Sequence, residues 1–309
     1  MVEVEGAVSS KTAVARGVPQ GSILGPVLFS LYVNDLLEGE ADFAIKMYAD
    51  DTTILQRSKN RGRLMELSDR AVLRVEKWFE ENKLNTNKEK TQNLLLTTKN
   101  RADHQSVKLL GFWIDDRISW VKHVDELCKK LATATYAVRQ IESIVGLEEA
   151  ILTYYAHFHS LANYGILIWG AAPCAVRVFQ RQRMALRALA RVPRTQNCRE
   201  LFRKFGILTI PCCYILECLI LVRKRQNELQ KHNQLHTYQT RSANQYVTPL
   251  HRLTKTQTSC TYMGIRFYNK VPNSLKTLSD RTFKTRIKAF LKCQAFYNIE
   301  EFMEYHWVM

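Results

Sequence analysis

The chain has 309 residues, of which 46% are hydrophobic and 24% charged, and its formal net charge is +16. This length suits two or three packed units, and the composition excludes an intrinsically disordered chain. The eight cysteines show no CxxC pair and no zinc-site spacing, so free thiols in a reducing compartment are expected.

Neither a secretory signal nor a membrane span is predicted. The first ten residues carry no basic segment followed by an apolar run, and the longest apolar runs are too short to cross a bilayer. We therefore expect an intracellular protein, in the nucleus or cytoplasm, with no membrane partner.

The net positive charge comes entirely from the second part of the chain. Residues 1–100 carry 14 basic and 14 acidic side chains, whereas residues 101–309 carry 31 and 15. This asymmetry predicts that the second part holds a polyanion. A solvated basic surface without a partner is the alternative.

Short strands alternate with helices in the first part, which predicts an α+β fold. A strand-like lead is followed by a turn rich in Gly, Pro and Ser, and then by a helix that begins near a proline. In chain order we expect the lead over residues 1–16, the turn over Gly17–Gly25, a helix over Pro26–Leu37, a hairpin over residues 43–56, an amphipathic helix over Arg61–Asn82, and strands over Asn93–Thr98 and Val107–Ile114.

The second part is predicted to be mostly helical. A proline stops the third of its helices, and another proline lies within a later helix pair. We expect helices over residues 122–144, 147–169, 175–192 and 281–296, a helix pair over 197–222, and an irregular polar stretch over 226–258.

One helix of this part, residues 175–192, has two contrasting faces. At about 100° per residue, apolar side chains such as Val178 and Leu186 fall on one arc. Arginines fall on the opposite arc, which predicts one face for packing and one for nucleic-acid phosphates. These arginines are Arg177, Arg181, Arg183, Arg187 and Arg191.

Two adjacent carboxylates occupy the centre of the predicted hairpin, in Met47-Tyr48-Ala49-Asp50-Asp51. β-Forming residues flank the pair, which predicts a strand, a tight turn with the acids at its tip, and a second strand. Adjacent carboxylates repel each other, and a divalent cation that binds both relieves the repulsion. An ordinary Asp-Asp turn is the alternative.

A glycine-rich turn precedes the hairpin, in Gly17-Val18-Pro19-Gln20-Gly21-Ser22. Gly21 lets the backbone approach a base pair or phosphate closely, and Gln20 offers an amide for hydrogen bonds to a template. The alternative is an ordinary turn in which Ser22 is the N-cap of the next helix.

Together, the two motifs resemble the template-primer loop and the metal-binding hairpin of a reverse transcriptase palm. Trp78-Phe79-Glu80-Glu81-Asn82 and the stretch to Thr91 resemble the W-x3-N-x-L-x-x-N-x-x-K-T segment of non-LTR retrotransposon enzymes, and Leu109–Asp115 resembles their primer grip, with Gly111 at the bend. Stretches as far as Pro272 are similar to jockey-like elements of arthropods.

The resemblance implies RNA-directed DNA synthesis with an RNA template, a DNA primer, dNTPs and two Mg²⁺ or Mn²⁺ ions in the parent enzyme. It makes Asp50 and Asp51 the metal ligands, Tyr48 a neighbour of the primer end, and Lys90 the general acid for leaving pyrophosphate. Lys88 competes for the last role, and a solvent-facing lysine is the alternative.

The resemblance also implies that parts of the enzyme are missing. This family has another metal-binding Asp upstream of the glycine-rich turn, but residues 1–16 contain only Glu3 and Glu5 as acids. Fingers and an endonuclease domain are absent too. We therefore expect a C-terminal portion, impaired alone, with a partial palm over 1–118, a helical thumb over 119–225 and a basic extension over 226–309. A catalytically dead nucleic-acid-binding remnant, or a translated fragment without a stable fold, are the alternatives.

Overall fold

The computed structural model describes residues 3–10, 17–18, 21–37, 43–97, 104–235 and 243–307. Its contacts separate two compact units, residues Met1–Asn93 and Leu94–Met309. The boundary between these units follows Asn93, whereas the sequence predicts that the palm ends at residue 118. The three-part division into palm, thumb and extension stays a prediction.

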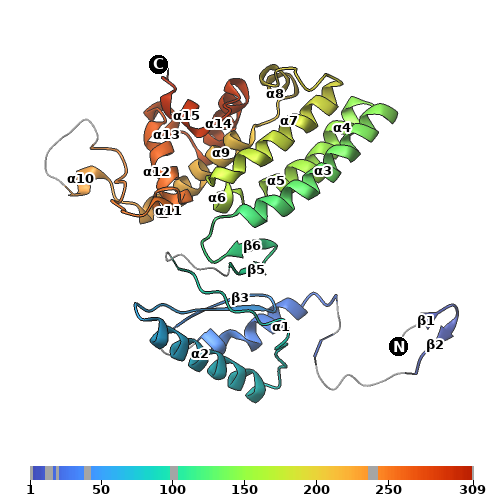
Figure 1. Cartoon of the computed structure of the whole chain (residues 1–309), viewed down its shortest axis with the longest axis vertical. Helices are drawn as coiled ribbons and strands as arrows, with labels where there is room; N and C mark the ends of the chain where they lie inside the picture. The colour runs from blue at the N-terminus through green and yellow to red at the C-terminus, as the bar shows by residue number, and fades with distance from the viewer. Residues whose placement is uncertain are drawn as a thin grey trace. The chain divides into compact units, whose positions relative to one another are not determined.

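The described residues of the first unit form two small antiparallel hairpins and two α-helices (Figure 1). The predicted hairpin and amphipathic helix are both present. The elements are β1 (Glu3–Val4), β2 (Ala7–Val8), α1 (Gly25–Tyr32), the 3-10 helix η1 (Asn34–Leu37), β3 (Ala44–Tyr48), β4 (Asp51–Leu55) and α2 (Arg61–Glu81).

Helix α2 forms where the sequence predicts it. Asn60 caps it by accepting a hydrogen bond from the Arg63 amide at 3.2 Å. Ala71 and Val75 are buried, as one face of an amphipathic helix requires. Helix α1 is shorter than expected, because the last helical hydrogen bond runs from the Val33 amide to the Phe29 carbonyl and the following residues form η1.

The second unit contains a third hairpin followed by helices (Figure 1). The hairpin consists of β5 (Ser106–Leu109) and β6 (Phe112–Asp115). The longer helices are α3 (Val121–Ile144), α4 (Leu147–Thr153), α7 (Val176–Ala190), α8 (Arg199–Phe205), α9 (Ile210–Lys224), α12 (Cys260–Lys270), α14 (Asp280–Gln294) and α15 (Ile299–Glu304). Shorter pieces are the π-helix η2 (Tyr154–His159), α5 (Ser160–Asn163), α6 (Ile166–Trp169), the 3-10 helices η3 (Pro173–Ala175) and η4 (Gln226–Glu228), α10 (His232–Leu235), α11 (Thr254–Gln257) and α13 (Asn273–Lys276).

Helix α9 forms the centre of this unit's hydrophobic core. It is predominantly apolar, and most of its residues from Ile210 to Val222 are buried. Helices α12 and α14 pack against it, and α7 packs against α3. The core explains why this part of the chain folds around helices rather than around its short hairpin.

The α+β fold class is confirmed, since the described residues combine antiparallel two-stranded sheets with many helices. Two of the predicted strands are wrong. Residues 93–97 form no strand, although the Thr97 amide donates to the Asp116 carbonyl at 3.2 Å. The single strand predicted over Val107–Ile114 is a hairpin, because Leu110 and Gly111 both adopt positive φ and reverse the chain.

The helix predicted over residues 147–169 is wrong as a single element. It consists of α4, η2, α5 and α6, and it breaks where Tyr164 is extended and Gly165 adopts a φ of +58°. Helices α12 and α15 were not predicted, although Ser259 and Asn298 cap them through their side chains.

No single described helix is long and apolar enough to span a membrane. Taken together, α8 and α9 are long and apolar enough by length and composition alone, but the pair is bent by 57°. Most of α9 is buried among the other helices of its unit, which accounts for its apolar character.

Candidate functional site

The two predicted metal ligands lie at the tip of the β3–β4 hairpin. Five cross-strand pairs fix its register, from Ala44 opposite Leu55 to Tyr48 opposite Asp51. Ala49 and Asp50 form the two-residue connection, and Ala49 adopts a φ of +53°. This register places Tyr48 and Asp51 side by side on one face of the hairpin.

The tip is open to solvent. Tyr48 is 70% exposed, and Asp50 and Asp51 are both exposed. On the other face, Ile45 and Ile54 are half-buried, so the two-residue alternation of the strands separates an apolar face from the aromatic and acidic one. The arrangement presents two carboxylates and a phenol ring to a ligand arriving from solvent.

The oxygen donors suit a hard divalent cation, but their number is small. Among the described residues, no group of three or more His, Cys, Asp or Glu side chains is placed to hold a metal ion. Asp50 and Asp51 therefore do not make a complete two-ion site by themselves. The missing upstream metal-binding Asp stays a prediction, because residues 1–2 and 11–16 lie outside the described residues.

The glycine-rich turn is only partly described, because Pro19 and Gln20 lie outside the described residues. Gly21 adopts a φ of +83°, so the turn does use its conformational freedom. The N-cap of α1 is Leu24, which makes no side-chain capping bond, and the alternative of Ser22 as the N-cap is wrong.

The two candidate general acids differ in their surroundings. The Lys88 ammonium lies 3.7 Å from the Glu76 carboxylate. The exposed Lys90 ammonium has no partner among the described residues, while its backbone amide donates to the Asn87 side chain at 3.2 Å. Lys90 is the freer cation of the two, and its role as proton donor stays a prediction.

Gly111 lies at the tip of the β5–β6 hairpin, which is bound to helices of the second unit. The Tyr164 hydroxyl donates to the Leu110 carbonyl at 2.9 Å, and the Tyr164 ring stacks on Phe112 with centroids 4.9 Å apart. The Lys122 ammonium lies 3.9 Å from the centre of the Trp113 ring. The hairpin tip is therefore held in one position.

Asp115, at the end of β6, organises the connection from this hairpin to α3. Its carboxylate accepts hydrogen bonds from the amides of Arg117, Ser119 and Trp120 at 2.9–3.2 Å, and from the Ser119 hydroxyl at 2.8 Å. Burial raises the pKa of Asp115, but these hydrogen bonds outweigh it and leave the pKa below its usual value.

Helix α7 has the predicted apolar face, with Val178, Phe179, Leu186 and Leu189 buried. Its arginines, however, are engaged within the chain, and their contact with nucleic acid stays a prediction. The partners are Asp125 for Arg177, the Met184 sulfur for Arg181, the rings of Phe179 and Tyr297 for Arg183, the Gln196 carbonyl for Arg187, and Glu142 for Arg191.

Sequence reasoning missed two further arginines that lie beside this helix. Arg139 on α3 and Arg194 after α7 line the same cleft as Arg187 and Arg191. The spacing of Arg187, Arg191 and Arg194 was visible in the sequence. Arg139 belongs to another helix, so only the fold brings it to the cleft.

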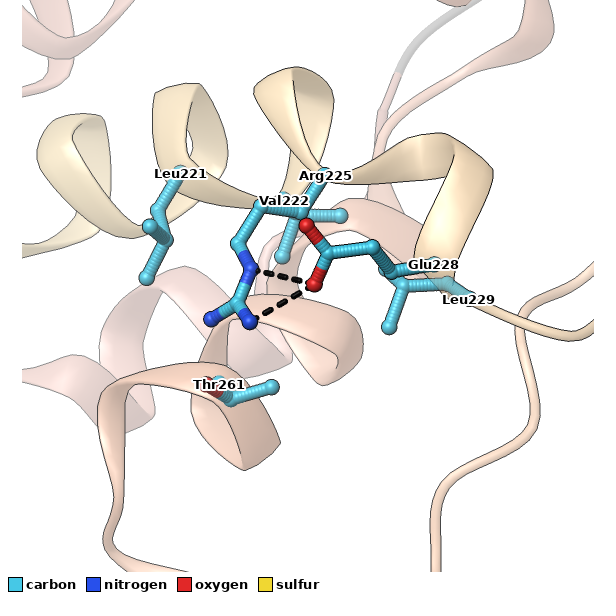
Figure 2. Close-up of a pocket in the computed structure, with 6 residues that line it drawn as sticks. All are labelled: Leu221, Val222, Arg225, Glu228, Leu229 and Thr261. Atoms are coloured by element: carbon cyan, nitrogen blue, oxygen red, sulfur yellow. Dashed lines mark hydrogen bonds and ion pairs between the residues drawn. The ribbon is translucent and has the colours of Figure 1, made fainter. Parts of the chain in front are cut away.

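A second, smaller cavity lies beside the end of α9 and has a volume of about 180 Å³ (Figure 2). Figure 2 shows the Arg225 guanidinium bound to the Glu228 carboxylate, with Leu221 and Val222 nearby. Both side chains of this ion pair are exposed at the surface and pair with each other beside the cavity. None of the predicted site residues lines it.

Comparison with known proteins relates the first part of the chain to one enzyme family. Residues 1–114 match the family described as reverse transcriptase (RNA-dependent DNA polymerase). This match contains the β3–β4 hairpin, the glycine-rich turn and Lys90. It ends before the helices of the second unit begin.

Similar proteins extend beyond this segment. The chain is 25% identical over 236 residues to the RNA-directed DNA polymerase from mobile element jockey of Drosophila melanogaster, which covers 67% of this chain and 25% of that protein. It is 26% identical over 190 residues to the probable RNA-directed DNA polymerase from transposon X-element of the same organism, over 55% of this chain and 21% of that protein. A Pol polyprotein from the type-1 retrotransposable element R1 of Bradysia coprophila is 26% identical over 175 residues.

These matches confirm the resemblance to reverse transcriptases of insect non-LTR retrotransposons. The chain spans about a quarter or less of the length of these relatives, with shares of 25%, 21% and 17%. No solved structure matches the chain. The family uses divalent metal ions, an RNA template and nucleotide substrates in general.

Proposed function

We propose that this chain is a reverse transcriptase segment of a non-LTR retrotransposon, whose reaction is RNA-directed DNA synthesis. The observation that carries the proposal is the hairpin tip, where Asp50 and Asp51 stand exposed beside Tyr48. The match of residues 1–114 to reverse transcriptases supports it.

In this proposal the substrates are an RNA template, a DNA primer and dNTPs. Mg²⁺ or Mn²⁺, when bound, supplies positive charge at the reacting phosphate oxygens. Asp50 and Asp51 contribute carboxylate oxygens toward that site, and Lys90 donates a proton to the leaving pyrophosphate. Gly21 and Gly111 lie in turns beside the template and primer strands.

The same chain is proposed to be impaired when it acts alone. The described residues place only two carboxylates at the tip, where two bound cations and the phosphates between them require more negative ligands. Weak extension by the purified chain is the expected result, with the residual activity dependent on Asp50.

A second candidate function, from another class, is nucleic-acid binding without catalysis. It is favoured by the charge distribution, since residues 101–309 carry 31 basic and 15 acidic side chains. A hydrophobic core also lies in the second unit, so this basic part has a packed scaffold of its own. This function predicts RNA affinity that falls steeply with salt and is unchanged by Asp50→Ala.

Primer extension separates the two functions. The assay uses the full chain, an RNA template annealed to a DNA primer, dNTPs and Mg²⁺, with Asp50→Ala as the test variant. Asp69→Ala is the matched control, because Asp69 is an exposed aspartate of α2 in the same unit. Extension that Asp50→Ala removes and Asp69→Ala preserves supports the polymerase. Extension that survives Asp50→Ala contradicts the proposed site.

The same reasoning distinguishes the two lysines. If Lys90 is the proton donor, Lys90→Ala slows extension more than Lys88→Ala does, because the Lys88 ammonium is held near Glu76. A single-turnover measurement at several pH values gives the readout. An equal effect of both substitutions would indicate a general loss of positive charge.

A further inference from the structure

We propose that the cleft between the C-terminal ends of α3 and α7 binds phosphodiester groups of a nucleic-acid strand. The cleft has a volume of about 440 Å³, and four arginines are among the residues that line it. The choice of nucleic acid as the polyanion rests on the proposed function, which supplies RNA and DNA as ligands. The arginines are Arg139, Arg187, Arg191 and Arg194.

Helices α3 and α7 run in the same direction, which brings their C-terminal ends to one place. Arg177 near the start of α7 pairs with Asp125 near the start of α3, and Arg191 after the end of α7 pairs with Glu142 near the end of α3. Each helix C-terminus carries a partial charge of about −0.5. Together with the Glu142 carboxylate, the two ends offset about half of the charge of four guanidiniums, and the cleft stays positive.

Two of the arginines are fixed in place by their own contacts. Arg187 donates from Nε and Nη2 to the Gln196 carbonyl, at 3.0 and 2.8 Å. Arg191 donates from Nη2 to the Glu142 carbonyl at 2.8 Å, in addition to its ion pair with the Glu142 carboxylate. A guanidinium has about five N–H donors, so both keep donors for a further acceptor. Glu142 is a positioning residue for Arg191.

The other two arginines are free to reach a ligand. Arg139 and Arg194 are exposed, and neither has a hydrogen-bond or ion-pair partner within the part of the chain that the structure describes. They lie on different elements, one on α3 and one in the segment after α7. Planar guanidiniums bind phosphate oxygens with paired hydrogen bonds. Two fixed and two free arginines around one cleft therefore suit successive phosphates of a strand.

Salt-dependent RNA binding tests the proposal. The full chain is titrated into a fluorescent single-stranded RNA of about 20 nucleotides at several salt concentrations, and anisotropy gives the affinity. Removing two phosphate contacts by Arg139→Ala with Arg194→Ala reduces the slope of log K against log salt by about 1.4, since each contact to a single strand contributes about 0.7.

The matched control removes the same charge elsewhere. Arg252→Ala with Arg286→Ala also deletes two exposed arginines, and neither lines the cleft. This control is expected to leave the slope within about 0.3 of the parent value. Thermal unfolding checks that both variants fold, and Arg139→Gln with Arg194→Gln repeats the test with longer side chains.

Several outcomes overturn the proposal. The first is that the parent chain does not bind RNA, and the second is that the salt slope falls equally in the cleft variant and in its control. The third is that inorganic phosphate, added at matched ionic strength, displaces the RNA fully. The last result makes the cleft a site for small anions. The binding assay contains no dNTPs or primer, so it does not depend on catalysis. If the separate primer-extension assay shows no product while RNA binding still depends on the cleft, the proposed polymerase function fails and the proposed cleft does not.

Discussion

Gln182 offers a direct test of how the second unit is held together. This residue of α7 is fully buried, and its side-chain hydrogen bonds join separate elements. Its Nε2 donates to the Tyr154 hydroxyl at 2.9 Å and to the Leu208 carbonyl at 2.8 Å, and its Oε1 accepts from the Ile210 amide at 2.9 Å. One side chain thus connects α7, the π-helix η2 and the start of α9.

The substitution Gln182→Met keeps the length of the side chain and removes these bonds. Tyr154, Leu208 and Ile210 then keep buried polar groups without this partner. Each such group costs about 1–3 kcal/mol, so the sum is at least about 3 kcal/mol of unfolding free energy. Local relaxation keeps the loss to about 3–5 kcal/mol.

Urea unfolding followed by tryptophan fluorescence measures this loss, because Trp169 lies in the core of the same unit. We expect a lower midpoint with an unchanged slope. Gln180→Met is the matched control, since Gln180 is exposed on α7, and it is expected to change stability by less than about 0.5 kcal/mol. A loss below about 1 kcal/mol for Gln182→Met would refute the reasoning.

Three more predictions test other parts of the second unit. Asp115→Ala removes the acceptor of four hydrogen bonds before α3 and is expected to cost about 2–3 kcal/mol in urea unfolding. Burial lowers the pKa of His123 and of His159, helped by nearby lysines, so the unfolded chain takes up protons first as pH falls. The stability that these histidines contribute is therefore present above their unfolded pKa of about 6.5 and is lost as the pH falls toward their lower pKa values in the folded chain. Urea unfolding at about pH 7.5 and about pH 5 should show a lower free energy of unfolding at the lower pH. The double substitution His123→Gln with His159→Gln should remove this difference. Gly165→Ala places a methyl group against the Phe112 ring and should lower the thermal midpoint more than Gly206→Ala does. The φ of Gly206 is nearly the same, but the nearest atom to a methyl group there is the Lys292 Nζ, at 3.7 Å.

Local patterns predicted the β3–β4 hairpin, α2 and the apolar face of α7 correctly, but not the β5–β6 hairpin that carries Gly111. The β3–β4 hairpin follows from strand-forming residues around a tight turn, and α2 from the spacing of residues such as Ala71 and Val75. The apolar face of α7 follows from the same periodicity. These features depend on neighbours in the sequence, so one chain without a structure is sufficient to find them.

Other features depend on partners that are distant in the sequence. Spacing shows that Arg177 and Arg191 share an arc, but it does not show that Asp125 and Glu142 on α3 pair with them. Likewise, Gly165 is only a weak signal in the sequence that the helix breaks there, and the sequence does not show that a ring from β6 packs against the break. Tertiary contacts decide both cases.

Extension by the full chain, compared with Asp50→Ala under single-turnover conditions, tests the central claim most directly. The claim is that the carboxylates at the β3–β4 tip belong to a polymerase site that is incomplete among the described residues. The predicted result is slow template-dependent extension that Asp50→Ala abolishes. Fast extension by the parent chain would contradict the incomplete site, and extension that persists in Asp50→Ala would contradict the assignment of the tip itself.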